Sequence, residues 1–106
     1  TKELIAPSAI DGLRIAAGDG RLTLTWDFAY DAKYRVLRAE EKDASYKQIA
    51  DAIETTRYAD NGLVEGTTYY YKVQAYNTAG DGPESEFLSA MPVVVQHIYK
   101  AVYEKA

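Results

Sequence analysis

Short segments in which hydrophobic residues recur at every second position constrain this fold more than any other feature. In the segment 21–28, Leu22, Leu24 and Trp26 alternate with polar residues. Because successive side chains of a β-strand point to opposite faces, this pattern predicts a strand with one buried face. We expect Trp26 to anchor the core from that face.

About seven strand-like segments of this kind follow one another along the chain. They lie around Leu13 and Ile15 and at 21–28, 32–40, 46–53, 55–63, 67–77 and 86–91. Turn signals separate them: Gly-Asp-Gly at 18–20 predicts a hairpin turn, Asn-Gly at 61–62 a second turn, and 79–85 a Gly/Pro loop. This spacing favours an antiparallel β-sandwich, with a small barrel as the alternative.

Three consecutive tyrosines, Tyr69 to Tyr71, cannot all face one side of a strand, so the segment 67–77 must divide them. One row of alternate residues is apolar and is predicted to face the core, and the other is polar and is predicted to face water. The inward row is Tyr69, Tyr71, Val73 and Ala75, and the outward row is Tyr70, Lys72, Gln74 and Tyr76.

The inward tyrosines have predicted structural roles. The Tyr69 hydroxyl is expected to bond the backbone near the turn at 61–63, which makes a tyrosine corner. Tyr71 is expected to pack in the core towards Trp26. Tyr34, from the segment 32–40, joins them as the fourth structural aromatic residue.

Composition and charge restrict the classes of function. The 106 residues suit one small domain, the net charge is −4, and there is no cysteine. An acidic chain argues against nucleic acid and anionic membranes as partners. Without cysteine there are no disulfides, thiolate metal sites or cysteine nucleophiles. No apolar run of about 18 residues occurs, so membrane insertion is not expected.

No set of residues has the pattern of a catalytic or metal site. The sole histidine is His97, and no serine lies in a nucleophile-elbow motif. The carboxylates that could act in pairs or bind calcium are interpreted as solvated turn residues. They are Asp19, Glu40, Glu41, Asp60, Asp81 and Glu84, with Asn61 as an added amide. We therefore expect no enzyme activity, no cofactor and no metal.

The ordered set of residues resembles a fibronectin type III domain. The matching residues are Pro7, Leu13, Leu22, Leu24, Trp26, Tyr34, Val36, Leu63, Gly66, Thr67, Tyr69, Val73, Ala75, Asn77, Gly80, Gly82, Ser85, Ala90 and Pro92. The segments 45–50, 56–63 and 66–85 are most similar to the bacterial variety found in secreted multimodular carbohydrate-active enzymes. The resemblance implies an immunoglobulin-like sandwich of seven strands and a non-catalytic role.

The resemblance also implies the domain organisation. Residues 1–6 are expected to be a linker, 7–92 the sandwich and 93–106 an extension whose pattern fits a helix or, less completely, a strand. The loop 79–82 lacks the arginine of the Arg-Gly-Asp adhesion motif, and the Trp-Ser-x-Trp-Ser signature of cytokine receptors is absent, so neither activity is implied. The chain is expected to be part of a larger secreted or cell-surface protein.

A strip of outward residues on two neighbouring strands is the remaining candidate contact surface. It consists of Arg35, Leu37, Tyr70, Lys72 and Tyr76. Cross-strand pairs of these types stabilise a sheet, and exposed tyrosines also stack on sugar rings. The strip is therefore expected to serve the sheet itself or to contact a polysaccharide, another protein or a neighbouring module of the same chain.

Overall fold

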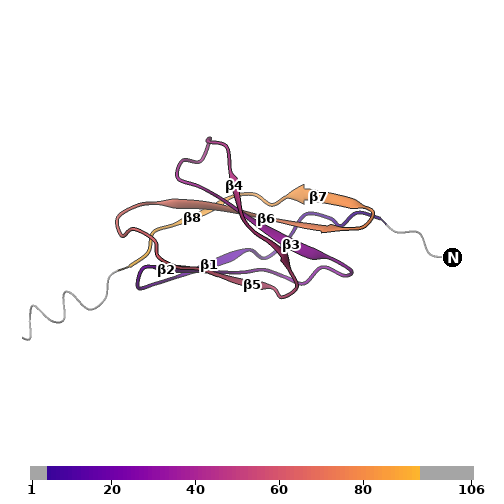
Figure 1. Cartoon of the computed structure of the whole chain (residues 1–106), viewed down its shortest axis with the longest axis horizontal. Helices are drawn as coiled ribbons and strands as arrows, with labels where there is room; N and C mark the ends of the chain where they lie inside the picture. Colours follow the sequence, from indigo (N-terminus) through magenta and orange to yellow (C-terminus); the bar gives the residue numbers. More distant parts are fainter. Residues whose placement is uncertain (1–4, 94–106) are drawn as a thin grey trace, which may run out of the picture.

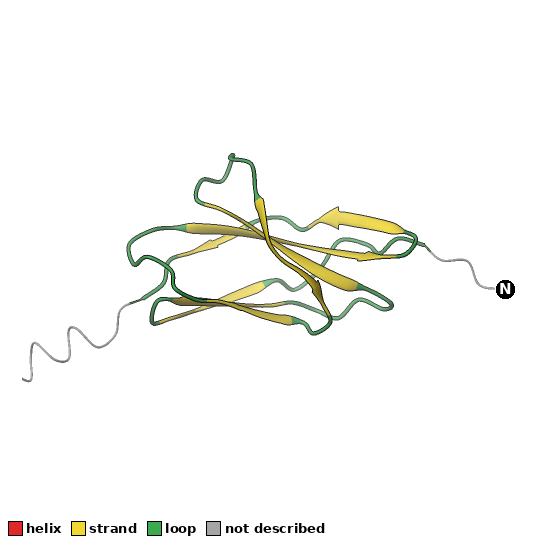
Figure 2. Cartoon of the chain, viewed as in Figure 1, coloured by secondary structure: helices red, strands yellow, loops and turns green. Residues whose placement is uncertain are grey.

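Two antiparallel sheets pack face to face in the computed structural model, which describes residues 5–93 (Figures 1 and 2). One sheet has the order β1-β2-β5, and the other has the order β4-β3-β6-β7 with β8 also paired to β6. The strands are β1 (Arg14–Gly18), β2 (Arg21–Thr25), β3 (Lys33–Ala39), β4 (Lys47–Ile53), β5 (Arg57–Asp60), β6 (Tyr69–Asn77), β7 (Gly80–Glu84) and β8 (Leu88–Ala90). The predicted β-sandwich is confirmed.

The core lies between the sheets and is built by the predicted alternation. Leu22 and Leu24 of β2 are fully buried, and Trp26, just after β2, is nearly so. They face Tyr34 and Val36 of β3 and the inward row of β6. A buried side chain of this size contributes about 1.5–3 kcal/mol relative to an exposed one, so these rows hold the two sheets together.

The turn at 18–20 closes the β1–β2 hairpin as predicted. Gly18 pairs with Arg21, and Gly20 has a φ of 65°, which a glycine adopts without strain. Val93 donates its N–H to the Gly18 carbonyl at 3.0 Å and accepts from Gly20 N–H at 3.2 Å. The last described residue is therefore bonded to this hairpin.

The prediction of a loop over 79–85 is wrong, because residues 80–84 form strand β7 along the edge of the larger sheet. Pro83 suggested a loop, but an edge strand tolerates proline since its missing N–H removes no ladder bond. At Ser85 the N–H still donates to the Val73 carbonyl at 2.9 Å, but the Ser85 side chain takes the place of a backbone carbonyl in the pairing with β6. Its Oγ accepts from Val73 N–H at 2.9 Å and donates to the Glu86 carbonyl at 3.0 Å, and β8 resumes the pairing beyond it.

The described chain begins and ends at opposite ends of the sandwich (Figure 1). At the end where it begins, the Asn77 side chain donates to the Ile5 carbonyl at 2.9 Å. At the other end, Leu63 N–H donates to the Gly20 carbonyl at 3.0 Å, next to the hairpin that holds Val93. We call these the N-terminal end and the C-terminal end of the sandwich.

Candidate functional site

The five residues of the predicted strip lie on one outward face of the larger sheet. Strands β3 and β6 are neighbours, with Lys33 opposite Tyr76 and Leu37 opposite Lys72. The side chains of the strip alternate with the buried rows of both strands. We call this surface, made of Arg35, Leu37, Tyr70, Lys72 and Tyr76, the sheet face.

Arg35 is the centre of a polar network on the sheet face. Its guanidinium carbon lies 3.9 Å from the centroid of the Tyr76 ring, which is a cation–π contact. It also donates to Gln74 at 3.0 Å and pairs with Asp81 at 3.1 Å. Tyr76 donates its hydroxyl hydrogen to Asp51 at 2.9 Å, and this bond, with the Ala52 N–H and Arg35, lowers the pKa of the Asp51 carboxyl.

The other aromatic rings near the sheet face also have partners within the chain. Tyr70 meets Phe87 edge-on with ring centroids 5.6 Å apart. Lys72 lies 4.5 Å from the Tyr46 ring and pairs with Glu84 at 3.3 Å. Such pairs stabilise a sheet by about 0.2–1 kcal/mol each, so these contacts support the structural interpretation of the strip.

Tyr69 forms the predicted tyrosine corner. Its hydroxyl oxygen accepts from Val64 N–H at 3.0 Å, one residue beyond the turn at 61–63. Tyr34 makes a similar connection at the other end of the sandwich, where its hydroxyl accepts from Ala29 N–H at 2.8 Å and donates to the Ala29 carbonyl at 3.3 Å. Trp26 stacks edge-on against Tyr34, with ring centroids 5.4 Å apart.

A buried polar cluster joins the two sheets, and the sequence pattern does not predict it. The interpretation of Asp60 as a solvated turn residue is wrong, because Asp60 lies in β5 and is only 6% exposed. Its Oδ2 accepts from Tyr71 Oη at 2.6 Å and from Arg38 Nη1 at 2.8 Å. Burial, together with the bond to Asp60, raises the pKa of the Tyr71 hydroxyl well above its ordinary value. Tyr71 and Asp60 are buried, Arg38 is partly exposed, and their bonds link the two sheets, so we interpret the cluster as structural.

Two aromatic residues at the N-terminal end are the main surface feature that the sequence interpretation missed. Phe28 is 74% exposed and Tyr30 is 81% exposed, both in the loop between β2 and β3. A sequence signal is present, since Phe28 and Tyr30 flank the small residue Ala29 and follow the buried Trp26 at the second and fourth positions after it. Their spacing of two continues the alternation of Leu22, Leu24 and Trp26 and by itself would place both rings in the core, but β2 ends at Thr25 and both rings are exposed in the loop that follows.

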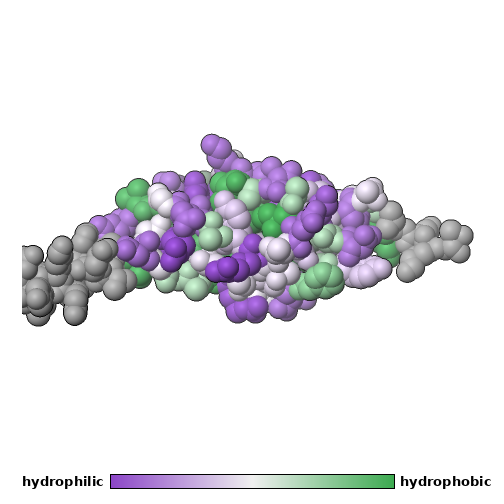
Figure 3. Space-filling view, turned by 60° about the horizontal axis from the view of Figure 1, so that its bottom comes forward, coloured by the Kyte–Doolittle hydropathy of each residue, from purple (hydrophilic) through white to green (hydrophobic). Residues whose placement is uncertain are grey.

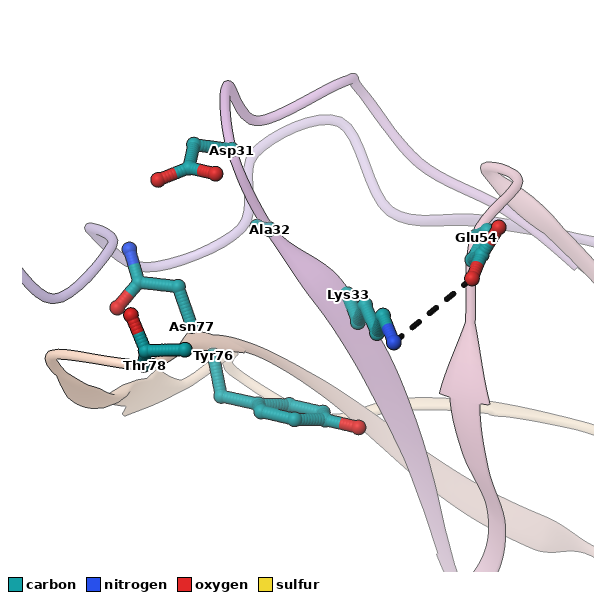
Figure 4. A pocket seen from close by; sticks show the side chains of 7 residues that line it. All are labelled: Asp31, Ala32, Lys33, Glu54, Tyr76, Asn77 and Thr78. Atoms are coloured by element: carbon teal, nitrogen blue, oxygen red, sulfur yellow. Dashed lines mark ion pairs between the residues drawn. The ribbon is translucent and has the colours of Figure 1, made fainter.

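This loop is bordered by two hollows. One, of about 280 Å³, is lined by residues 7–11 and 27–30. The other, of about 480 Å³, is lined mostly by polar residues from the start of β3, the turn after β4 and the end of β6, and two of them, Lys33 and Glu54, pair at 3.8 Å (Figure 4). Its lining residues are Asp31, Ala32, Lys33, Glu54, Tyr76, Asn77 and Thr78.

The acidic side chains of the described residues are dispersed over the sandwich. Between residues 5 and 93, no three His, Cys, Asp or Glu side chains are grouped as a metal site would require. In the same part of the chain, no helix has the length and hydropathy to cross a membrane. His97 and the predicted extension beyond Val93 lie outside the described residues. Hydrophobic residues on the visible surface are scattered among hydrophilic ones (Figure 3).

Comparison with known proteins places this geometry in a family. The family described as "Fibronectin type III domain" matches residues 6–91. An amylopullulanase of Thermoanaerobacter thermohydrosulfuricus is 32% identical over 85 residues, which cover 79% of this chain and 6% of that protein. A receptor-type tyrosine-protein phosphatase F of Danio rerio is 36% identical over 69 residues, which cover 61% of this chain and 4% of that protein.

A solved structure gives the same result at the level of the fold. The crystal structure of a β-1,2-glucanase from Parabacteroides distasonis aligns with a TM-score of 0.69 and 27% identity, over 85% of this chain and 14% of that one. The chain thus spans a small part of each of these relatives. With two antiparallel sheets, a tyrosine corner and a family match over residues 6–91, the chain belongs to the fibronectin type III family.

Proposed function

We propose that this chain is a non-catalytic module of a larger secreted protein, of the multimodular carbohydrate-active kind, and that it holds the flanking parts of that protein at a set separation. The observation that carries the proposal is the position of the described ends. Residues 5 and 93 lie at opposite ends of one two-layer sandwich (Figure 1). A packed sandwich transmits position because its interior is dense and resists deformation.

The bonds at both ends support a spacer role. Asn77 fixes the Ile5 carbonyl, and Gly18 and Gly20 fix Val93. Gly82 lies against the backbone of Pro7. A Cβ added to residue 82 would collide with the Pro7 carbonyl oxygen. The segments that lead into and out of the module are therefore attached to the sandwich.

The association with carbohydrate-active proteins is supported by two relatives. The amylopullulanase and the β-1,2-glucanase are both much longer than the part that this chain matches. A non-catalytic role is supported by the partners of the polar groups between the sheets, since the buried Asp60 accepts hydrogen bonds from both Tyr71 and the partly exposed Arg38. A secreted location follows from the same resemblance and is part of the proposal.

The spacer role can be tested by placing the module between two fluorescent reporter domains. We expect energy transfer between the reporters to show one narrow distribution of separations. A matched control carries a flexible Gly/Ser linker of equal residue count, for which a broad distribution is expected. A distribution across the module as broad as that across the linker would overturn the spacer role.

Contact through the sheet face is a second candidate function. It is supported by the alignment of Arg35, Leu37 and Lys72 on adjacent strands, which brings an aliphatic and two cationic side chains together. The partner would be a neighbouring module, another protein or a polysaccharide. Substituting Leu37→Asp should weaken such a contact without disturbing the core, because Leu37 is on the outward row. If the Leu37→Asp variant binds such a partner as tightly as the parent chain does, contact through the sheet face is excluded.

A further inference from the structure

The loop between β2 and β3 exposes two aromatic rings that take no part in the core. Phe28 and Tyr30 are the most exposed aromatic residues that the structure describes, at 74% and 81%. Single exposed hydrophobic residues are ordinary on a protein surface. Two aromatic rings two positions apart on one short loop are a different case, because each exposes apolar area that burial would stabilise.

The backbone of this loop is fixed at three points. Asp27 N–H donates to the Asp11 carbonyl at 3.0 Å, and both backbone groups of Ala29 bond the hydroxyl of the buried Tyr34. Asp31 turns the chain with a φ of 55°, a left-handed conformation that aspartate tolerates better than most residues. The two rings are therefore presented from a rigid support, which reduces the entropy that a ligand must overcome on binding.

Hydrogen-bonding groups line both hollows, and the smaller hollow is also lined by the two rings. Ser8, Asp11 and Asp27 line the smaller hollow, together with Phe28 and Tyr30. The larger hollow begins at the next residue, Asp31, and continues over Asn77 and Thr78 (Figure 4). Arg14 pairs with Asp27 at 3.6 Å at the rim, and both side chains are exposed.

Rings flanked by hydroxyl, amide and carboxylate groups match the chemistry of a pyranose. The C–H face of a sugar packs on an aromatic ring, and its equatorial hydroxyls bond carboxylate, amide and hydroxyl groups. Several carboxylates border the loop, which disfavours anionic sugars and nucleic acid. A neutral oligosaccharide has both the C–H faces and the hydroxyl groups, and it carries no negative charge that the carboxylates would repel.

We propose that the loop 27–31 and its two hollows form a binding site for a neutral glucan oligosaccharide, with Phe28 and Tyr30 as the stacking platform. The choice of a glucan rests on the proposed function, whereas the location rests on the loop itself. This site lies at the N-terminal end of the sandwich and shares one residue with the sheet face, Tyr76, which lines the larger hollow. An open site of this kind binds weakly, so we expect a Kd of about 1 mM.

The site can be tested by titrating the ¹⁵N-labelled chain with maltohexaose, cellohexaose and a β-1,2-linked glucohexaose while recording amide chemical shifts. For at least one sugar we expect saturable shifts confined to residues 8–11, 27–33 and 77–79. The double variant Phe28→Ala/Tyr30→Ala should keep its spectral dispersion, because both side chains are exposed, and should bind about tenfold or more weakly.

A matched variant, Tyr46→Ala/Phe87→Ala, also removes one Tyr and one Phe, but from beside the sheet face. It should bind as tightly as the parent chain. Absence of saturable shifts with all three sugars, shifts confined to the sheet face, or shifts that survive Phe28→Ala/Tyr30→Ala would overturn the proposal. Shifts of the loop amides that follow protein concentration without sugar would instead assign the rings to contact between copies, and would overturn it too.

The spacer and the saccharide site can fail separately. A narrow distribution of reporter separations with no sugar-induced shifts would leave the spacer and remove the site. Saturable loop shifts with a broad distribution of separations would leave the site and remove the spacer.

Discussion

Tyr69, Tyr70 and Tyr71 show how position along a strand decides what one residue type does. The Tyr69 hydroxyl accepts from the backbone of Val64, the Tyr70 ring lies against Phe87, and Tyr71 donates to the buried Asp60. These roles follow from the alternation of β6, in which Tyr69 and Tyr71 face inward and Tyr70 outward.

Tyr69→Phe should lower the free energy of unfolding by about 1–3 kcal/mol, because the Val64 N–H loses a partly buried hydrogen bond. Tyr70→Phe is the control and should change it by less than about 0.5 kcal/mol, since water can replace the contacts of a hydroxyl on the outward row. Denaturant melts of both variants provide the measurement. The reverse order of costs would show that β6 is shifted by one residue.

Tyr71 should make the module sensitive to alkaline pH. Its folded-state pKa is raised by burial and by the bond to Asp60, whereas the unfolded chain has a tyrosine pKa of about 10. The stability from this group is therefore complete below about pH 10 and is lost as the pH rises above that value. Melts of the parent chain and of Tyr71→Phe at pH 8 and pH 11 should show a smaller pH-dependent loss in the variant. Equal losses would contradict the assignment.

At the scale of the element, the strands with clear alternation could be predicted from the sequence and the irregular ones could not. The inward rows of β2, β3 and β6 follow from local pattern alone. The strand β7 was missed because Pro83 and its glycines signal a turn, and only the pairing with β6 across the sheet overrides that signal. Asp60 was misassigned for a similar reason, since its partner Arg38 lies 22 positions away in the sequence.

The candidate site was predictable only in part. Alternation placed Arg35 and Tyr76 on one outward face, but it could not show that the guanidinium covers the Tyr76 ring. Phe28 and Tyr30 continue the alternation of the β2 segment but are exposed: β2 ends at Thr25, and the backbone of Ala29 between them bonds the hydroxyl of the buried Tyr34. Contacts of this kind are set by tertiary packing and have no local pattern.

Trp26 tests the face assignment of the β2 segment. It packs edge-on against Tyr34 inside the core, so Trp26→Ala should cost about 3–5 kcal/mol, as expected for removing a large buried aromatic side chain. Thermal or denaturant unfolding gives the value. A loss below about 1 kcal/mol would mean that the buried face has been assigned to the wrong row.

Ser85 tests how the edge of the larger sheet is held. Ser85→Ala leaves the buried Val73 N–H without the Oγ acceptor, so it should cost about 1–3 kcal/mol. The matched control Ser89→Ala, at an exposed position of β8, should cost less than about 0.5 kcal/mol. Hydrogen exchange at Val73 should also become faster in Ser85→Ala. Equal stability of the two variants would show that the Ser85 side chain does not hold this edge.

At the scale of the whole molecule, the sandwich connects two distant points of the chain through one core. The core cluster includes residues of both sheets, from Ile10 near the start of the described chain to Ala75 in β6. Because the two ends are bonded to opposite ends of this body, their separation is set by the fold and not by the length of a linker. This rigidity is the central claim for the function of the module.

The separation of the ends can be measured directly because the chain contains no cysteine. Ile5→Cys and Val93→Cys place spin labels at two exposed positions at opposite ends of the sandwich. Pulsed electron–electron double resonance should give a single narrow distribution of distances between the labels, centred near the long dimension of the sandwich. A broad distribution, or one centred at a distance shorter than the sandwich, would contradict the account.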